Sequence, residues 1–202
     1  MPHAARCLIA LAGLTTAPAA AQPCHPGVAQ TLVLDAHHEY AHAGRSVAIS
    51  AGALAVGVYN DNRLGVGTGS VTVYRPDPGV WQLETELFPP RPTVGGWFGH
   101  SVAADADRIL VGAPFTIVSG QVAGSAHVYR RDANLGWVAE GELLAPARAQ
   151  DDRFGHSVAL AGDTAVVGVP RDDRPGFTNA GSVMVYEFAN GAWSHAQTLF
   201  PP

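Results

Sequence analysis

Apolar and polar residues alternate with a period of two in short runs along much of the chain. The run Val71-Thr72-Val73-Tyr74 shows this alternation clearly, and residues 182–187 repeat it. A period of two is typical of β-strands. The dipeptides Ala51-Gly52 and Gly162-Asp163 separate neighbouring runs and predict tight hairpin turns. No convincing helical periodicity follows residue 21, so the pattern predicts an all-β protein.

A second pattern has a much longer period. The sextet Phe-Gly-His-Ser-Val-Ala occurs at 98–103 and 154–159, and a diverged copy, Ala-Gly-Arg-Ser-Val-Ala, occupies 43–48. The copies begin 55 and 56 residues apart, which indicates an array of similar structural units. Further landmarks recur at nearly constant offsets in all three units: Gly57, Gly112 and Gly168; Gly69-Ser70, Gly124-Ser125 and Gly181-Ser182; Tyr74, Tyr129 and Tyr186; Trp81, Trp137 and Trp193; Leu87, Leu143 and Leu199.

Each unit is predicted to contain four short strands. In the first unit they cover 46–50, 54–59, 70–75 and 81–87. The fourth strand is the most polar, which suits an outer edge exposed to water. Repeated units of four antiparallel strands are typical of β-propeller blades. We therefore expect an all-β fold of β-propeller blades with three repeats, an incomplete propeller because propellers have at least four blades.

These motifs carry a resemblance to a known family. Phe-Gly-x-Ser-Val-Ala, then Ile109-Leu110-Val111-Gly112-Ala113-Pro114, then Gly-Ser-x-x-Val-Tyr resembles the FG-GAP repeat of integrin α-subunit propellers. It is more similar still to the calcium-free version found in bacterial secreted proteins. The resemblance covers about residues 30–202 and implies a closed ring of seven blades. The first unit departs from the pattern, since Ala43 replaces Phe and Val58-Tyr59 replaces Ala-Pro.

The repeat also sets the domain boundaries. Gln30-Thr31-Leu32 matches Gln197-Thr198-Leu199, so an orphan fourth strand is expected at about 28–34. Because the third unit already has its own fourth strand, this extra strand has no vacancy to fill. Either the coding sequence is truncated or chains self-associate to complete the propeller. The predicted segments are a signal peptide at 1–21, an N-terminal tail at 22–42, and blades at 43–97, 98–153 and 154–202.

The N-terminus predicts export. His3 and Arg6 precede a short apolar run, Cys7–Leu14, and Ala19-Ala20-Ala21 forms a small-residue cleavage site. The apolar run is too short to span a bilayer, and no later run reaches 18 apolar residues. A secreted or periplasmic bacterial protein is expected. Cleavage would leave Cys24 as a lone thiol, which excludes an intrachain disulfide.

Composition agrees with this class. Charged residues make up 14% of the chain, and the 23 Gly and 15 Pro suit a turn-rich β-protein. The net charge is −5, and all 12 basic residues are Arg, a hint of a GC-rich bacterial genome. No basic stripe is present, which argues against a nucleic-acid partner.

One motif of the chain is typical of a catalytic metal site. His38-Glu39-Tyr40-Ala41-His42 matches H-E-x-x-H, in which two His bind zinc and Glu acts as base. That chemistry requires a helix, because only there do residues i and i+4 share a face. The motif instead lies in a predicted loop directly before a strand. A metal-dependent hydrolase is therefore the alternative hypothesis, alongside adventitious metal binding by His37, His38 and His42.

Two weaker constellations remain. Arg45, His100 and His156 occupy one repeat position on the strand expected to line the central channel; a hydrogen bond to the neighbouring blade is the preferred interpretation over an anion or metal site. Acidic loops could offer calcium oxygens, but integrin propellers carry their calcium loop between the first two strands, where this chain has a bare turn. Solvated surface charge is the preferred account of these loops, which are Asn60-Asp61-Asn62, Asp151-Asp152 and Asp172-Asp173.

The function favoured by the sequence is a secreted, non-enzymatic module for protein or carbohydrate binding and adhesion, or a fragment of a larger propeller. Recognition would fall to the variable loops 60–69, 115–124 and 171–181. The expected partner is an extracellular or cell-surface protein or glycan, with no cofactor, metal, nucleic acid or membrane span. A non-functional gene remnant is the other alternative.

Overall fold

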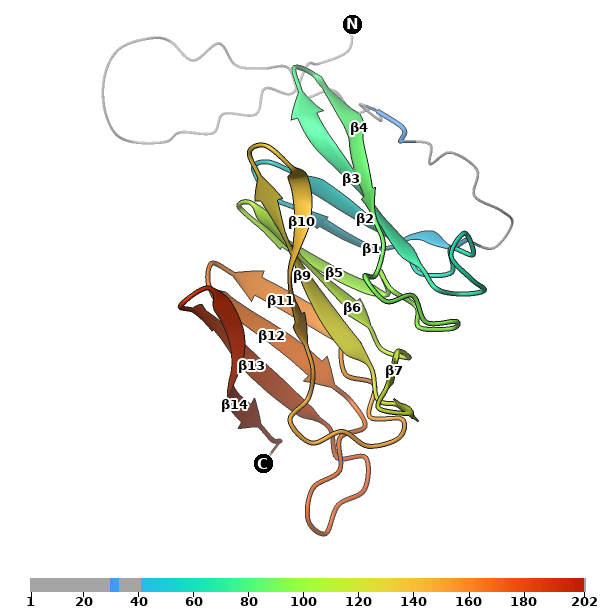
Figure 1. The fold of residues 1–202 in the computed structure, drawn as a ribbon, viewed down its shortest axis with the longest axis vertical. Helices are drawn as coiled ribbons and strands as arrows, with labels where there is room; N and C mark the ends of the chain where they lie inside the picture. Colours follow the sequence, from blue (N-terminus) through green and yellow to red (C-terminus); the bar gives the residue numbers. More distant parts are fainter. Residues whose placement is uncertain (1–29, 33–40, 202) are drawn as a thin grey trace, which may run out of the picture. The chain divides into compact units, whose positions relative to one another are not determined.

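A computed structural model describes residues 30–32 and 41–201 of the chain (Figure 1). The chain divides into two compact units, 1–33 and 34–202. In the first unit, Gln30 and Thr31 are exposed and residues 30–32 have no regular secondary structure. The rest of the predicted strand at 28–34, the signal peptide and Cys24 lie outside the described residues. Within the described part of the chain, no helix has the length and apolar character needed to cross a membrane.

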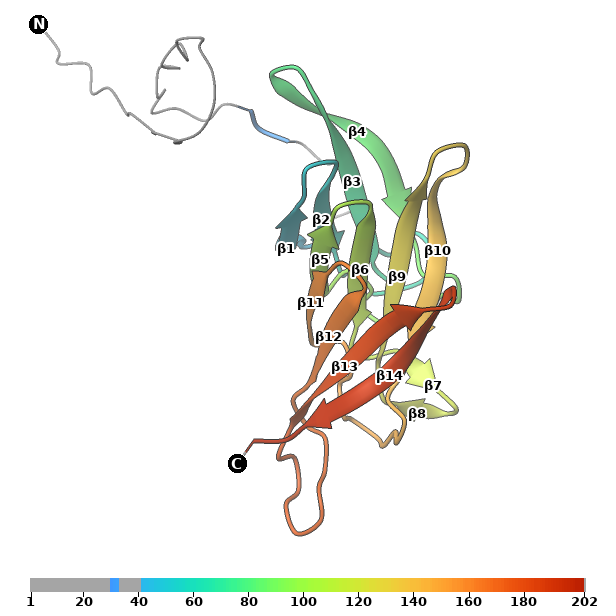
Figure 2. The same cartoon turned by 90° about the vertical axis from the view of Figure 1, so that its left-hand side faces the viewer.

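The second unit contains three antiparallel four-stranded sheets, one for each repeat (Figures 1 and 2). The described residues form no helix, which confirms the all-β prediction and the four-stranded blades. A two-stranded hairpin is added in the second blade. The strands are β1 (Ala43–Ile49), β2 (Leu54–Val58), β3 (Ser70–Asp77) and β4 (Val80–Leu87); β5 (Ser101–Asp105), β6 (Arg108–Ala113), β9 (Ser125–Asp132) and β10 (Gly136–Leu143); β11 (Ser157–Ala161), β12 (Thr164–Val169), β13 (Ser182–Ala189) and β14 (Ala192–Leu199); with β7 (Ile117–Val118) and β8 (Gln121–Val122).

Strand order in each blade follows the chain. Short hairpins join the first strand to the second and the third to the fourth, whereas longer loops join the second to the third. Ala51-Gly52 and Gly162-Asp163 lie in the first hairpins of their blades, as the sequence predicted. Each pairing of a third with a fourth strand contains a register shift, next to Tyr74, Tyr129 or Tyr186. A β-bulge increases local twist, so the repeated shift twists each outer hairpin in the same place.

The blades share their cores through the phenylalanine that opens the next unit. Phe98 is buried among Val71, Val73 and Leu87 of the first blade. Phe154 is buried in the same way among Ala126, Val128 and Leu143 of the second blade. Isolated parallel bridges join Gly69 to Phe98 and Gly124 to Phe154. The Phe-Gly motif is thus the joint between consecutive blades.

The backbone around each phenylalanine forms a turn that only certain residues adopt easily. The amide of His100 donates to the carbonyl of Trp97, and the amide of His156 donates to the carbonyl of Arg153. The glycine inside each turn is left-handed, with φ of 86° at Gly99 and 87° at Gly155, as a type II turn requires. The first unit keeps this backbone conformation without the phenylalanine, since Gly44 has φ of 81°.

Candidate functional site

Arg45, His100 and His156 form a row across the three blades. Arg45 lies in β1, while each histidine directly precedes the first strand of its blade, β5 or β11. The Arg45 guanidinium nitrogen Nη2 lies 3.2 Å from His100 Nε2. The His100 and His156 rings lie 4.8 Å apart between centroids. The structure therefore brings the three predicted residues together, and Arg45–His100 is a hydrogen bond between neighbouring blades, as expected.

Electrostatics keep the two imidazoles neutral. Burial, with the nearby charge of Arg45 and the His156 ring, lowers the pKa of His100 to about 4. Burial also lowers the pKa of His156, helped by Arg153 and Arg45. Neutral rings attract anions poorly. No group of three His, Cys, Asp or Glu suited to a metal is found in the part of the chain that the structure describes. The row therefore links neighbouring blades.

The loops between the second and third strands of each blade form a second candidate site for binding a ligand. Each loop closes on itself through one backbone hydrogen bond at a shared repeat position. The amides of Gly69, Gly124 and Gly181 donate to the carbonyls of Asp61, Thr116 and Asp172. The loops that follow the fourth strands lie against them, since Gly95 N donates to Val66 O and Asp151 N to Val122 O. We call this set of loops, 59–69, 88–97, 114–124, 144–153 and 170–181, the loop face.

Although the bases of these loops agree, their tips differ and expose apolar side chains. Ile117 is 52% exposed in the β7–β8 hairpin, and Phe177 is 59% exposed in the third blade. Leu64, Val66 and Val94 are also exposed on the loops of the first blade. Arg174 lies over the Phe177 ring, with its guanidinium carbon 4.4 Å from the ring centroid. Loops that carry such variable side chains on a rigid scaffold are common sites of recognition.

A polar cavity of about 320 Å³ adjoins Ile117, between the loop 88–97 and the second blade. Arg91, Glu142 and Arg148 line it together with Thr116 and Ser119. Arg91 and Glu142 form an ion pair. Guanidinium and hydroxyl groups around one hollow suit the hydrogen bonding of a carboxylate or sugar hydroxyl. Sequence patterns do not predict this cavity, because its residues come from loops and strands far apart in the chain.

The acidic loops are structural, and the expectation of solvated surface charge is wrong for two of them. Asp61 is only 1% exposed and Asp152 only 3%. Burial favours protonation of Asp61, but hydrogen bonds from Arg63 and Ser70 outweigh it and lower the pKa to about 2. Arg63 binds Asp61 through Nη2 at 2.6 Å. The Asp61 oxygens thus serve the loop itself.

The other two acidic loops are also engaged. Asp151 forms ion pairs with Arg153 and Arg171, and Asp152 accepts a hydrogen bond from the Ala149 amide. Asp172 accepts a hydrogen bond from the Ser182 hydroxyl, the pairing that Ser70 makes with Asp61. Position 61 and its third-blade counterpart therefore fasten their loops by the same side-chain contact.

The H-E-x-x-H motif is described only at its end. His38, Glu39 and Tyr40 lie outside the described residues. His42 has φ of 55° and stacks on Tyr59 at 5.3 Å between ring centroids. β1 begins at the next residue. His42 thus occupies the left-handed turn position that Trp97 and Arg153 hold in the later units.

Comparison with known proteins agrees with this architecture. A family model described as FG-GAP repeat matches residues 81–129 and 137–186. Each match begins at the tryptophan of a fourth strand and ends at the tyrosine of the next blade's third strand. It therefore spans the blade junction. No curated protein matches the chain.

Three four-stranded antiparallel blades, joined through the Phe-Gly turns, define a propeller-type repeat protein. The matched segments contain both complete Phe-Gly-x-Ser-Val-Ala motifs and both junctions. The chain is an FG-GAP repeat protein.

Proposed function

We propose that this protein is a secreted, non-enzymatic binding module that recognises an extracellular protein through its loop face. The observation that carries the proposal is the contrast within that face: the loop bases repeat, whereas the tips differ and expose apolar side chains such as Ile117 and Phe177. A scaffold with variable contacts is the usual design of a recognition surface. FG-GAP repeats point to the same general role.

A protein is favoured over a glycan because aliphatic tips bury apolar surface on binding. Burial of such side chains is the main favourable term in protein association. The cavity beside Arg91 and Arg148 would add specificity by accepting an acidic or hydroxyl group of the ligand.

Export by the segment 1–21 would place the module outside the cytoplasm. Intact-mass analysis of exported protein should find residue 22 as its first residue.

The loop face is tested with two charge-matched double variants of the full chain. Ile117→Asp with Phe177→Asp alters the loop face, and Val80→Asp with Leu135→Asp alters exposed apolar residues at the opposite ends of the sheets. Binding is measured to immobilised extracellular-matrix proteins and to a glycan array. The loop variant should bind the recognised protein at least about tenfold more weakly, while the control binds normally. Equal binding by both variants, or recognition of glycans alone, would contradict the proposal.

A further inference from the structure

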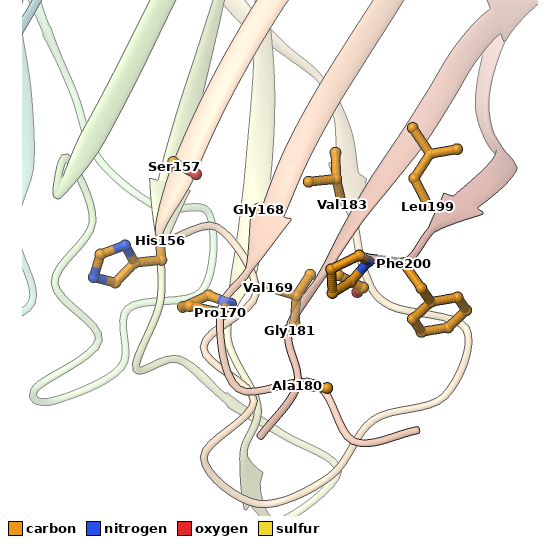
Figure 3. A pocket seen from close by; sticks show the side chains of 12 residues that line it. His156, Ser157, Gly168, Val169, Pro170, Ala180, Gly181, Val183, Leu199 and Phe200 are labelled. Carbon is orange, nitrogen blue, oxygen red and sulfur yellow. The ribbon is translucent and has the colours of Figure 1, made fainter. Parts of the chain in front are cut away.

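The third blade carries an open groove at a position that is filled in the first and second blades. It has a volume of about 510 Å³. It lies at the end of the sheet where β11 and β13 begin and β12 and β14 end (Figure 3). Val183, Leu199 and Phe200 border it on one side, and His156, Ser157 and Gly168 on the other. The Val183 and Leu199 side chains are 37% and 44% exposed. Apolar side chains exposed side by side in this way require explanation.

The same repeat positions are covered in the other blades. Val71 and Leu87 of the first blade are 0% and 5% exposed, and Ala126 and Leu143 of the second are 0% and 1% exposed. In both blades the phenylalanine of the next unit packs against them. The groove is therefore the socket of a blade junction.

The backbone of the groove repeats the filled sockets as well. Ser46 and Ser101 each donate a 2.8 Å hydrogen bond to the glycine carbonyl of the next blade's turn. Ser157 holds the third copy of this hydroxyl, and it lies against Gly168 as Ser101 lies against Gly112. Among the described residues, no carbonyl of another blade lies within 3.6 Å of the Cβ position of Gly168. The socket retains both its donor and its space for an incoming carbonyl.

The first blade presents the complementary half of the junction. Gly44 keeps the left-handed turn of Gly99 and Gly155, and no described atom lies within 4 Å of its Cβ position. At Gly99, by contrast, that position is 2.4 Å from the carbonyl oxygen of Ser70 in the preceding blade. β1 also exposes Val47 and Ile49 by 63% and 65%. Their counterparts in β5 and β11 pack on the junction cores, and these are Val102, Ala104, Val158 and Leu160.

The geometry points to head-to-tail association of two copies of this chain, in which the Gly44 turn of one copy enters the third-blade groove of the other. The Ser157 hydroxyl would donate to the Gly44 carbonyl, while Val47 and Ile49 cover the apolar wall at Val183 and Leu199. This contact continues an interface already formed twice within the chain. Among the described residues each copy presents one groove and one turn, so two copies satisfy both halves of the junction in a closed dimer.

Ala43 makes the proposal sharply testable. It stands where the other units have phenylalanine, so the intermolecular socket lacks the ring that fills the internal ones. The variant Ala43→Phe should therefore tighten the dimer. Val47→Asp and Leu199→Asp place a charge on each half of the junction and should disrupt it. Leu135→Asp, at an exposed turn of the second blade, is the matched control.

The experiment measures the mass and dimer dissociation constant of the full chain by light scattering and analytical ultracentrifugation. We expect a dimer in the micromolar range, at least tenfold tighter in Ala43→Phe and at least tenfold weaker in Val47→Asp and Leu199→Asp, with Leu135→Asp unchanged. Circular dichroism and thermal melts identify variants that fail to fold. A folded monomer at 100 µM, larger open assemblies, or a dimer insensitive to all three junction variants would overturn the proposal.

Discussion

The carbonyl oxygen of Gly155 lies 2.0 Å from the position that a Cβ atom on Gly112 would occupy. The corresponding distance from the Cβ position of Gly57 to the Gly99 carbonyl oxygen is 2.1 Å. Real side chains do not approach backbone oxygen so closely, so both positions accept only glycine. Glycine at this position of the first two units is thus required by the next blade, which brings its backbone against the sheet.

Replacing Gly112 with alanine should destabilise the fold by about 1–3 kcal/mol, because the second and third blades must move apart. Gly168→Ala is the matched control. Its Cβ would meet chiefly the Ser157 hydroxyl, at 2.2 Å, and a hydroxyl can rotate away. Chemical denaturation of both variants, under conditions where the chain is monomeric, measures the difference. Similar losses of unfolding free energy in the two variants would show that the interblade carbonyl is not the cause.

The Asp61 carboxylate should contribute stability that disappears in acid. The pKa of Asp61 is about 2 in the folded protein, below its ordinary 3.8, so the unfolded chain binds the proton first as the pH falls. The contribution is complete above about pH 4 and is lost as the pH falls toward 2. We expect Asp61→Asn to cost about 2 kcal/mol at pH 7, the range for hydrogen bonds to a charged group.

The measurement for Asp61 is urea unfolding of wild type and Asp61→Asn at several pH values. The difference in unfolding free energy should shrink between pH 4 and pH 2. Asp107→Asn, which alters an exposed carboxylate, is the control and should change stability little. A difference between wild type and Asp61→Asn that stays constant down to pH 2 would contradict the assigned pKa.

The sequence predicted the strands and the repeat well because both depend on local pattern. Period-two alternation located the third strands, and the recurring glycines located the units. The sequence could not explain why residue 112 must be glycine, because the cause is the carbonyl of Gly155, 43 residues later in the chain. The prediction that Asp61 is a solvated surface charge was wrong for a similar reason. Its carboxylate lies in a polar loop, but Arg63 and Ser70 enclose it by donating hydrogen bonds. Sequence pattern reports faces and turns, but burial of a loop residue depends on how the loop folds back.

The two junction tyrosines should each contribute one interblade hydrogen bond. The Tyr129 hydroxyl donates to the Phe88 carbonyl at 2.5 Å, and the Tyr186 hydroxyl donates to the Leu144 carbonyl at 2.7 Å. Tyr129→Phe and Tyr186→Phe should each lower the unfolding free energy by about 0.5–1.5 kcal/mol. Tyr59→Phe is the control, because the contacts of Tyr59 are made by its ring. An equal loss for Tyr59→Phe would remove the hydroxyls as the explanation.

The His100 imidazole should make the fold less stable in mild acid. Its pKa is about 4 in the folded protein, against about 6.5 in an unfolded chain. Between these values the unfolded chain binds more protons, so stability falls as the pH drops from 6.5 and levels off below 4. Arg45 and His156 face the ring and oppose its protonation. With partial solvent screening, His100 should account for about 1 kcal/mol lost between pH 7 and pH 5.

His100→Gln isolates this contribution, because the amide oxygen can still accept a hydrogen bond from Arg45 without titrating. Thermal melts at pH 7 and pH 5 should show a decrease in melting temperature about 2–4 °C smaller for His100→Gln than for wild type. His195→Gln, which alters an exposed histidine of β14, should leave the wild-type decrease almost unchanged. If wild type and His100→Gln lose the same stability on acidification, the buried imidazole is not the group that responds to pH.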